Sequence, residues 1–376
     1  MSTVCIDCRY IGPRPSGIGE VVRNLIACLP GMAPDLRFVL LRNPLCGTRL
    51  STAPNVVEWD VAAPANGPRT MWGLSRVVDF TDVDLFHATF NIMPARLPVP
   101  CVTTIHDIMW LTNPAWCRTG PRGWIERHFY SHGIRRAIRS SRAIAAVSRA
   151  SADAIAAYAP HAADRTHVTL SGVSVRFRPV EPDQNVLTSL GLRPDRPFIL
   201  TVGQYAPYKN HEGALRGFAK AFSHRPEIDL VLVQRMGKAT HRLLELAKSL
   251  GIADRVQLVP TVSEQVLLSL YAMAKALLHP SFCEGFGNPI AEAMACGCPV
   301  VTSNRSAMPE VTGGASLLAA PDDPAAIARA LTMIVDDEKA AACLRRTGLE
   351  RAAQLQWNAF AEANLAIYRS ILADRS

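Results

Sequence analysis

A strand, a glycine-containing loop, a helix and a second strand follow one another between residues 276 and 302, and this pattern constrains the fold more strongly than any other. Residues 276–279 form an apolar run typical of a short buried strand, and residues 299–302 predict the next strand. Residues 289–296 have helical apolar spacing, with Gly297 as the stop. Because a helical crossover normally joins parallel strands, the segment predicts a βαβ unit of a parallel sheet.

The start of this helix has the chemistry of an anion site. Asn288 is a favourable N-cap and Pro289 suits the first helical position, so we expect the helix to begin there. We assign the free amides that face the loop to Ile290 and Ala291, with Asn288 as a further donor. Amides at a helix start attract anions, above all phosphate.

Glycines and a carboxylate complete this loop. Gly285 and Gly287 let the backbone approach a ligand closely, and Glu292 lies one turn into the helix, within reach of a polyol. The segment therefore predicts a phosphorylated ligand that also carries hydroxyl groups. Considered alone, Glu292 is equally well interpreted as a first-turn glutamate that the helix dipole favours.

Glu284 and Glu292, with seven residues between them, flank Gly285 and Gly287 in a pattern that resembles the motif of the family 4 retaining glycosyltransferases. These nucleotide-sugar enzymes have an α/β fold with two Rossmann-like domains facing each other across a cleft, the arrangement called GT-B. The resemblance implies that Glu284 contacts hydroxyls of the donor sugar and that Glu292 hydrogen-bonds the ribose. It also implies that the amides between them hold the diphosphate.

The length of the chain indicates two domains. At 376 residues it exceeds the size at which a single core usually stops growing, and the proline-rich stretch 177–183 is the expected hinge. We expect a Rossmann-like domain on the acceptor side at residues 1–178 and a nucleotide-sugar-binding domain at residues 185–355. The resemblance implies that a helix at residues 356–376 crosses back to the first domain.

Composition narrows the location and the partners. No apolar run is long enough to span a bilayer, and Asp7 and Arg9 interrupt the stretch that a secretory signal needs, so we expect a cytoplasmic protein. The ten cysteines lack a second pair at zinc-ligand spacing, and we expect no metal site. The net charge of +8 comes without the interleaved aromatics of a nucleic-acid site, which favours nucleotide phosphates and a membrane surface as partners.

A basic stretch at residues 122–139 bears on membrane contact. Its arginines face a single glutamate, and Trp124 and Phe129 supply apolar surface. Peripheral contact with an anionic membrane, at its inner face, is one interpretation. A core helix with a solvated basic face is an equal alternative.

The chain opens with a strand at residues 3–7, a turn that contains Gly17 and Gly19, and a helix from residue 20. The resemblance implies that this turn closes over the donor diphosphate, which assigns Gly17 and, as a further candidate, Gly19. A tight strand–helix turn without a ligand is the alternative.

Two histidines lie at or near strand ends in the first half of the chain. His106 directly follows the strand predicted at residues 102–105, where open α/β sheets bind ligands. The resemblance implies that His106 contacts the donor sugar. We expect His87, inside the strand at residues 85–88, to be structural.

Gly203 ends the first strand of the second half, and a candidate cationic residue follows it. Lys209 resembles the family lysine that neutralises the donor phosphates as the leaving group acquires charge. Many members of the family carry an arginine where this chain has Gln204, and we expect Arg235, after the next strand, to take its place. Val262 lies where the family's backbone contacts the nucleotide base, so the identity of the base stays open.

We therefore expect a retaining, metal-independent hexosyltransferase without a cofactor, whose candidate catalytic residues are His106, Lys209 and Glu284. The candidate donor-binding residues are Gly17, Gly19, Gly203, Gln204, Arg235, Val262, Gly287, Asn288, Ile290 and Glu292. The resemblance favours GDP-mannose as the donor, with UDP-glucose as the alternative, and a glycan or lipid-diphosphate-linked acceptor in bacterial polysaccharide synthesis. A glycoside hydrolase, a nucleotide-sugar epimerase and a catalytically silent sugar-nucleotide-binding subunit are the alternatives, the last because of Gln204.

Overall fold

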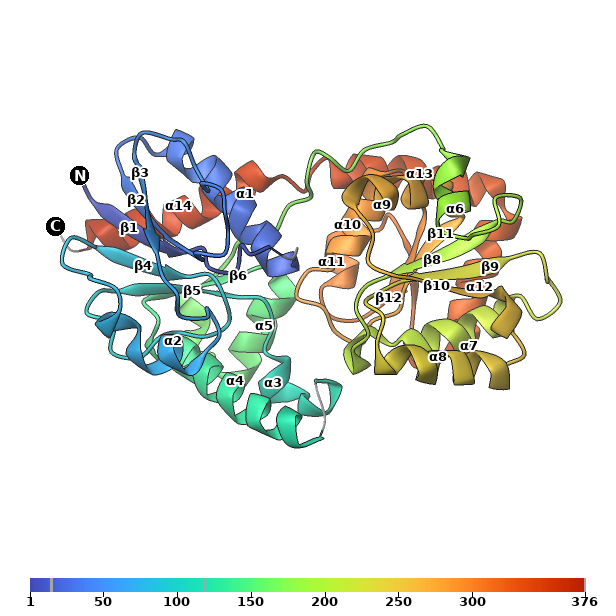
Figure 1. The fold of residues 1–376 in the computed structure, drawn as a ribbon, viewed down its shortest axis with the longest axis horizontal. Helices are drawn as coiled ribbons and strands as arrows, with labels where there is room; N and C mark the ends of the chain where they lie inside the picture. Colours follow the sequence, from blue (N-terminus) through green and yellow to red (C-terminus); the bar gives the residue numbers. More distant parts are fainter. Residues whose placement is uncertain (14–15, 118–119, 375–376) are drawn as a thin grey trace. The chain divides into compact units, whose positions relative to one another are not determined.

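The computed structural model describes residues 1–13, 16–117 and 120–374, which form two compact units, each built on a parallel sheet (Figure 1). The first unit comprises Met1–Pro114, Arg118–Gly172 and Gln356–Ser376, and the second comprises Ala115–Cys117 and Val173–Leu355. The predicted α/β class with two Rossmann-like domains is confirmed.

The chain passes from the first unit to the second after Gly172, whereas the proline-rich stretch alone placed this boundary at residue 178. The Val173 amide donates to the Leu355 carbonyl at 2.9 Å, and the Phe177 ring lies 6.2 Å from that of Tyr271. Residues before the prolines are therefore already anchored in the second unit.

The first unit contains a parallel sheet flanked by helices. Its strands are β1 (Thr3–Asp7), β2 (Arg37–Arg42), β3 (Val56–Asp60), β4 (Leu85–Ala88), β5 (Cys101–Ile105), β6 (Ala143–Ala146) and β7 (Thr166–Val168), in the order β3-β2-β1-β4-β5-β6-β7. Its helices are α1 (Gly17–Met32), α2 (Pro68–Gly73), α3 (Met109–Thr112), α4 (Gly120–Ser140), α5 (Arg149–Tyr158) and α14 (Trp357–Ala373), with short 3-10 turns at Leu74–Arg76 and Pro160–Arg165, while the turn Pro114–Trp116 lies where the chain enters the short segment Ala115–Cys117 of the second unit. The strand order reverses between β1 and β4, as in a doubly wound Rossmann sheet.

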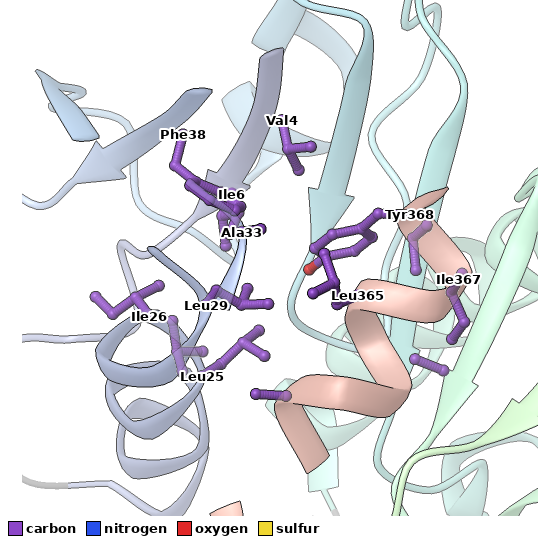
Figure 2. Close-up of a cluster of buried hydrophobic side chains, with 14 of the residues drawn as sticks. Val4, Ile6, Leu25, Ile26, Leu29, Ala33, Phe38, Leu365, Ile367 and Tyr368 are labelled. Carbon is purple, nitrogen blue, oxygen red and sulfur yellow. The ribbon is translucent and has the colours of Figure 1, made fainter. Parts of the chain in front are cut away.

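One face of this sheet packs against the first and last helices of the chain. Val4 and Ile6 of β1 point to the same side, because alternate strand residues share a face. Figure 2 shows Leu25 of α1 and Leu365 of α14 in the same buried cluster. The segment expected at residues 356–376 as a returning helix thus contains α14, which lies in the first unit beside α1.

His87 is part of this core. Its Nδ1 lies 2.5 Å from the Tyr368 hydroxyl and its Nε2 lies 2.8 Å from Thr104 Oγ1. Burial lowers the pKa of His87 to about 3, so the ring is neutral at neutral pH. These contacts agree with the structural role expected for it.

The second unit repeats the strand order of the first without its last strand. Its strands are β8 (Phe198–Val202), β9 (Asp229–Val233), β10 (Val256–Val259), β11 (Ala276–His279), β12 (Val300–Ser303) and β13 (Leu317–Ala319), in the order β10-β9-β8-β11-β12-β13. Its helices are α6 (Gln184–Ser189), α7 (His211–Ala221), α8 (Lys238–Ser249), α9 (Glu264–Met273), α10 (Asn288–Ala295), α11 (Met308–Thr312), α12 (Pro324–Asp336) and α13 (Glu338–Ala352), with 3-10 turns η4 (Pro207–Lys209) and η5 (Ala253–Arg255). The strand order here reverses between β8 and β11.

Leu230 and Leu232 of β9 pack with Phe218 of α7 and Leu243 of α8 in the core of this unit. Among the described residues, no helix combines the length and apolar character needed to cross a membrane.

Candidate functional site

The candidate site of the second unit lies where β8 and β11 end. These two strands are neighbours in the sheet, and Leu277 of β11 is paired with Leu200 of β8. The loop after β8 leads to Lys209, and the loop after β11 leads to Glu284. Because ligands of open α/β sheets bind at the carboxyl ends of the strands where the order reverses, this edge is the expected ligand site.

Lys209 and Glu284 form an ion pair at this edge. Lys209 Nζ lies 2.7 Å from Glu284 Oε1, and the two side chains are only 14% and 11% exposed. His279 Nε2 lies 2.9 Å from the same oxygen, and Ser281 Oγ donates to it at 2.9 Å. Three donors therefore converge on one carboxylate oxygen.

These contacts decide the charge of Glu284. Burial raises the pKa of this carboxyl, but the charge of Lys209 and the contact with His279 hold the pKa well below its ordinary value. Burial lowers the pKa of His279, although Glu284 acts in the opposite direction. His279 is therefore neutral at neutral pH. Since a carboxylate only accepts hydrogen bonds, the ring carries its proton on Nε2.

The loop after β8 holds Lys209 in place. Gly203 has a φ of 141°, and a Cβ added to it would lie 3.2 Å from Lys209 Cδ. Asn210 adopts a left-handed φ of 53°. Its Nδ2 donates to the carbonyls of Pro280 at 3.0 Å and Pro321 at 2.7 Å. Asn210 thereby ties the Lys209 loop to the loop that carries Glu284.

The main chain around Glu284 is also fixed. Ser306 Oγ donates to the Glu284 carbonyl at 2.7 Å and accepts from the Glu284 amide at 3.3 Å. The Phe282 amide donates to the Tyr208 carbonyl at 2.7 Å, which connects the two loops a second time. The side chain of Glu284 is thus presented from a backbone with several anchors.

The helix after this loop, α10, begins differently from the sequence expectation. Gly287 is the N-cap and Asn288 is the first helical residue, so the assignment of Asn288 as N-cap is wrong. Gly287 has a φ of 100°, a left-handed conformation that glycine adopts readily and that turns the chain into the helix one residue earlier. The Ile290 amide donates to the Gly287 carbonyl at 2.9 Å, so the expectation that it is a free donor is also wrong.

Glu292 is held by a buried tyrosine. The Tyr271 hydroxyl, on α9, donates to Glu292 Oε2 at 3.0 Å. Burial and the charge of Glu292 raise the pKa of Tyr271 well above its ordinary value, so the phenol stays a neutral donor. Glu292 lies beyond the first turn of α10, which contains no acidic residue, so a first-turn dipole effect does not account for it.

The other donor-binding candidates of the second unit lie outside this bonded cluster. Gln204 and Arg235 are exposed and Val262 is half-buried. They follow β8, β9 and β10 respectively, at the same edge of the sheet as Lys209. Neither Gln204 nor Arg235 is among the side chains bonded to Glu284.

His106 follows β5 in the first unit and is fixed on several sides. Its amide donates to Asn91 Oδ1 at 2.7 Å, and its carbonyl accepts from Ser151 Oγ at 2.7 Å. Its Nε2 lies 3.2 Å from the Thr89 carbonyl, so this nitrogen carries the proton. Burial lowers the pKa of His106 to about 4, against the effect of the Thr89 hydrogen bond. The ring is therefore neutral at neutral pH.

Gly17 and Gly19 lie in the first turn of α1, also in the first unit. Ser16 caps this helix by accepting from the Gly19 amide at 3.0 Å. A Cβ on Gly19 would lie 2.7 Å from the Tyr10 carbonyl oxygen, so packing alone requires a glycine there. Gly17 is exposed.

Sequence reasoning missed several residues of this site: His279, Ser281, Asn210, Ser306 and Tyr271. The rule that polar side chains at the carboxyl end of a strand face the ligand edge identifies the first two, which end and follow β11. The other three act through contacts between segments far apart in sequence, and residue spacing gives no indication of them.

Known proteins resemble both halves of the chain. Residues 184–351 match the family Glycosyl transferases group 1, and residues 15–177 match Glycosyltransferase Family 4. The O-antigen chain mannosyltransferase B of Escherichia coli is 30% identical over 292 residues, which are 77% of this chain and 74% of the relative. The serotype-specific mannosyltransferase WbdA of Escherichia coli is 28% identical over 287 residues, 75% of this chain but only 35% of the relative.

Solved structures show the same fold at lower identity. Sucrose-phosphate synthase from Thermosynechococcus elongatus has a TM-score of 0.74 at 20% identity, with complete coverage of both chains. Anabaena HepE, solved in complex with UDP and glucose, has a TM-score of 0.71 at 17% identity and covers 98% of this chain and 100% of its own. With this GT-B fold and these sequence matches, the chain belongs to the group 1, family 4 glycosyltransferases.

Proposed function

We propose that this glycosyltransferase transfers mannose, with retention of configuration, from GDP-mannose to a hydroxyl of a glycan or lipid-diphosphate-linked oligosaccharide in bacterial polysaccharide synthesis. The ion pair of Lys209 and Glu284 at the switch point of the second unit carries this proposal. The name of the relative O-antigen chain mannosyltransferase B supports mannose. HepE, solved with UDP and glucose, supports UDP-glucose as the alternative donor.

Lys209 and Glu284 suit the two ends of such a donor. A preorganised ammonium stabilises the negative charge that develops on the leaving diphosphate, which is the proposed role of Lys209. The ionised Glu284 accepts hydrogen bonds from sugar hydroxyls. Because its pKa is held low, Glu284 is a poor proton donor, whereas a glycoside hydrolase needs a carboxylic acid with a raised pKa. This difference supports glycosyl transfer over hydrolysis by a carboxylate pair.

The remaining donor contacts are proposed from the same edge of the second unit. Glu292, held by Tyr271, hydrogen-bonds the ribose, and Val262 lies in the segment that contacts the base. Gly287 and Asn288 bring the start of α10, with its dipole, to the diphosphate.

Other contributions are proposed from exposed or first-unit residues. Arg235 supplies the second positive charge that Gln204 does not, and the helix dipole and the cationic side chains make a metal ion or other cofactor unnecessary. For the first unit, the roles of Gly17 toward a diphosphate and of the neutral His106 toward a sugar stay predictions from the family resemblance.

Turnover and stereochemistry test the transferase proposal. The protein is incubated with GDP-mannose or UDP-glucose and a panel of acceptors that includes polyprenyl-diphosphate-linked oligosaccharides. Release of the nucleoside diphosphate measures turnover, and NMR of the product gives the anomeric configuration. An α-linked product, formed at the same rate with EDTA present, is expected. A β-linked product contradicts retention, and tight donor binding without turnover on any acceptor supports a silent binding subunit.

The nucleotide base is tested separately by thermal shift. GDP, UDP and ADP are compared at equal concentration, because a ligand that binds only the folded state raises its stability by an amount that grows with the ratio of ligand concentration to Kd. Stabilisation by GDP alone is expected. Stabilisation by UDP alone would instead indicate that the donor is a UDP-sugar and not GDP-mannose.

We also propose that the first unit contacts an anionic membrane through an exposed surface on α2 and α4. Trp124 and Ile125 of α4 are 64% and 62% exposed, and Trp72 of α2 is 48% exposed. Trp72 contacts Phe129 of α4 at 5.8 Å between ring centroids, so the apolar residues of both helices are adjacent. Exposed arginines lie along the same helix, α4: Arg122, Arg127, Arg135 and Arg139. Exposed aromatics beside arginines are typical of interfacial binding.

Vesicle co-sedimentation tests this surface. Binding to phosphatidylglycerol-containing vesicles, weaker at high salt and weaker for Trp124→Ala/Ile125→Ala, is expected. Met333→Ala, which removes an apolar side chain that is 49% exposed in the second unit, is the matched control. Equal binding of the double variant and the control contradicts the proposal.

A further inference from the structure

We propose that His279 is a positioning residue for the donor sugar. Together with Ser281 it fixes Glu284 by one carboxylate oxygen and so presents the other oxygen to a sugar hydroxyl. This inference rests on the proposed function, in which Glu284 contacts the donor sugar.

The geometry of the carboxylate carries the inference. The bonds that Lys209, His279 and Ser281 make to Glu284 all end on Oε1, at 2.7, 2.9 and 2.9 Å. His279 Nε2 and Ser281 Oγ are themselves 3.1 Å apart, so the two donors form one cluster. A partial rotation of the carboxylate breaks all of these bonds together, and a half-turn only exchanges its two equivalent oxygens. The cluster therefore selects a single orientation of Glu284.

His279 is held more rigidly than the lysine that shares its acceptor. It is the last residue of β11, it is 2% exposed, and its main chain is paired with Thr302 of β12. Thr302 Oγ1 also donates to the His279 carbonyl at 2.8 Å. Groups presented from strands are positioned more precisely than groups on loops, and Lys209 ends a short 3-10 turn.

The two donors also differ in what donor binding demands of them. In the proposed function Lys209 serves the diphosphate, so its bond to Glu284 weakens when the donor binds. His279 and Ser281 have no such second task and keep Glu284 oriented. His279 does this as a neutral N–H donor. The charged and titratable groups that act on Glu284 are Lys209 and His279, with His211 of α7 close enough to feel its charge.

Calorimetry with GDP-mannose and with GDP separates a sugar-positioning role from a structural one. His279→Leu, which releases Glu284 from one of its orienting bonds, is expected to weaken GDP-mannose about tenfold and to leave GDP binding unchanged. His279→Gln places an amide nitrogen where Nε2 lies and is expected to restore the affinity. His279→Asn, whose side chain is shorter by one methylene, is expected not to restore the affinity. This matched pair tests the proposal even if His279→Leu does not fold.

A double-variant cycle shows whether His279 acts through Glu284. If it does, adding His279→Leu to Glu284→Ala causes no further loss of GDP-mannose affinity. Equal weakening of GDP and GDP-mannose by His279→Leu, or a further loss in the Glu284→Ala background, overturns the inference. If wild type prefers GDP-mannose to GDP and all of the His279 variants show the same preference, this inference alone is overturned. If the wild type binds neither these ligands nor UDP and UDP-glucose, the proposed function fails as well.

Discussion

Replacing Lys209 by methionine is predicted to destabilise the folded protein because it leaves the buried Glu284 carboxylate without its cation. Removing one partner of a buried pair costs about 3–5 kcal/mol when the remaining charge is left alone. Here His279 and Ser281 still donate to the carboxylate, at 2.9 Å each. A loss near that of one charged hydrogen bond, about 2–3 kcal/mol, is therefore expected.

The pH dependence of this loss has a defined sign. The folded-state pKa of Glu284 is depressed, so its ionic contacts contribute stability above the unfolded pKa of about 4.3. That contribution disappears as the pH falls through the lower folded value. The stability difference between wild type and Lys209→Met should therefore be constant near neutral pH and shrink progressively below about pH 4.

Urea denaturation measures both effects. Circular dichroism and tryptophan fluorescence are followed together, so that separate transitions of the two units are detected. Glu284→Gln serves as the control background. A neutral amide does not need the cation, so Lys209→Met should lower the free energy of unfolding less in Glu284→Gln than in wild type. If the Lys209→Met variant is as stable as wild type, the reasoning is refuted. It is also refuted if Lys209→Met lowers the free energy of unfolding equally in the wild-type and Glu284→Gln backgrounds.

Two further substitutions test other parts of the site. Gly203→Ala and Gly191→Ala both place a side chain at a positive φ (141° and 70°), at a strain of about 1–3 kcal/mol, but only Gly203 lies against Lys209. Both should lower stability in urea, and only Gly203→Ala should also weaken GDP binding by calorimetry; equal binding by the two variants contradicts the proposed positioning of Lys209. Tyr271→Phe removes the bond to the Glu292 carboxylate, at a cost of about 1.5–3 kcal/mol in stability, and should weaken GDP and GDP-mannose equally, because the ribose is common to both. A loss confined to GDP-mannose would contradict the ribose assignment.

The central strands of both sheets were predictable from sequence. Residues 3–7, 85–88 and 276–279 form strands with the expected bounds, because strands buried on both faces appear as continuous apolar runs. The edge strands at residues 56–60 and 166–168 were not predicted. Their side chains are largely half-exposed, so no such run marks them.

The candidate site was predicted as a set of residues and not as an arrangement. Glu284 and Lys209 were identified from motifs that resemble the family, but their ion pair depends on how β8 and β11 align, which the sequence does not specify. The N-cap of α10 was misassigned because capping propensity favours Asn288, while the left-handed conformation of Gly287 decides where the helix begins.

The central claim is that Lys209 and Glu284 form the donor site of the second unit, with Glu284 serving the sugar. Calorimetric titration of wild type and Glu284→Ala with GDP-mannose, UDP-glucose and the two free nucleotides tests it most directly. We predict that wild type binds one nucleotide sugar more tightly than its nucleotide. Glu284→Ala should bind that nucleotide as wild type does and lose the additional affinity for the sugar. If Glu284→Ala retains the full preference for the nucleotide sugar, the assignment of this site is contradicted.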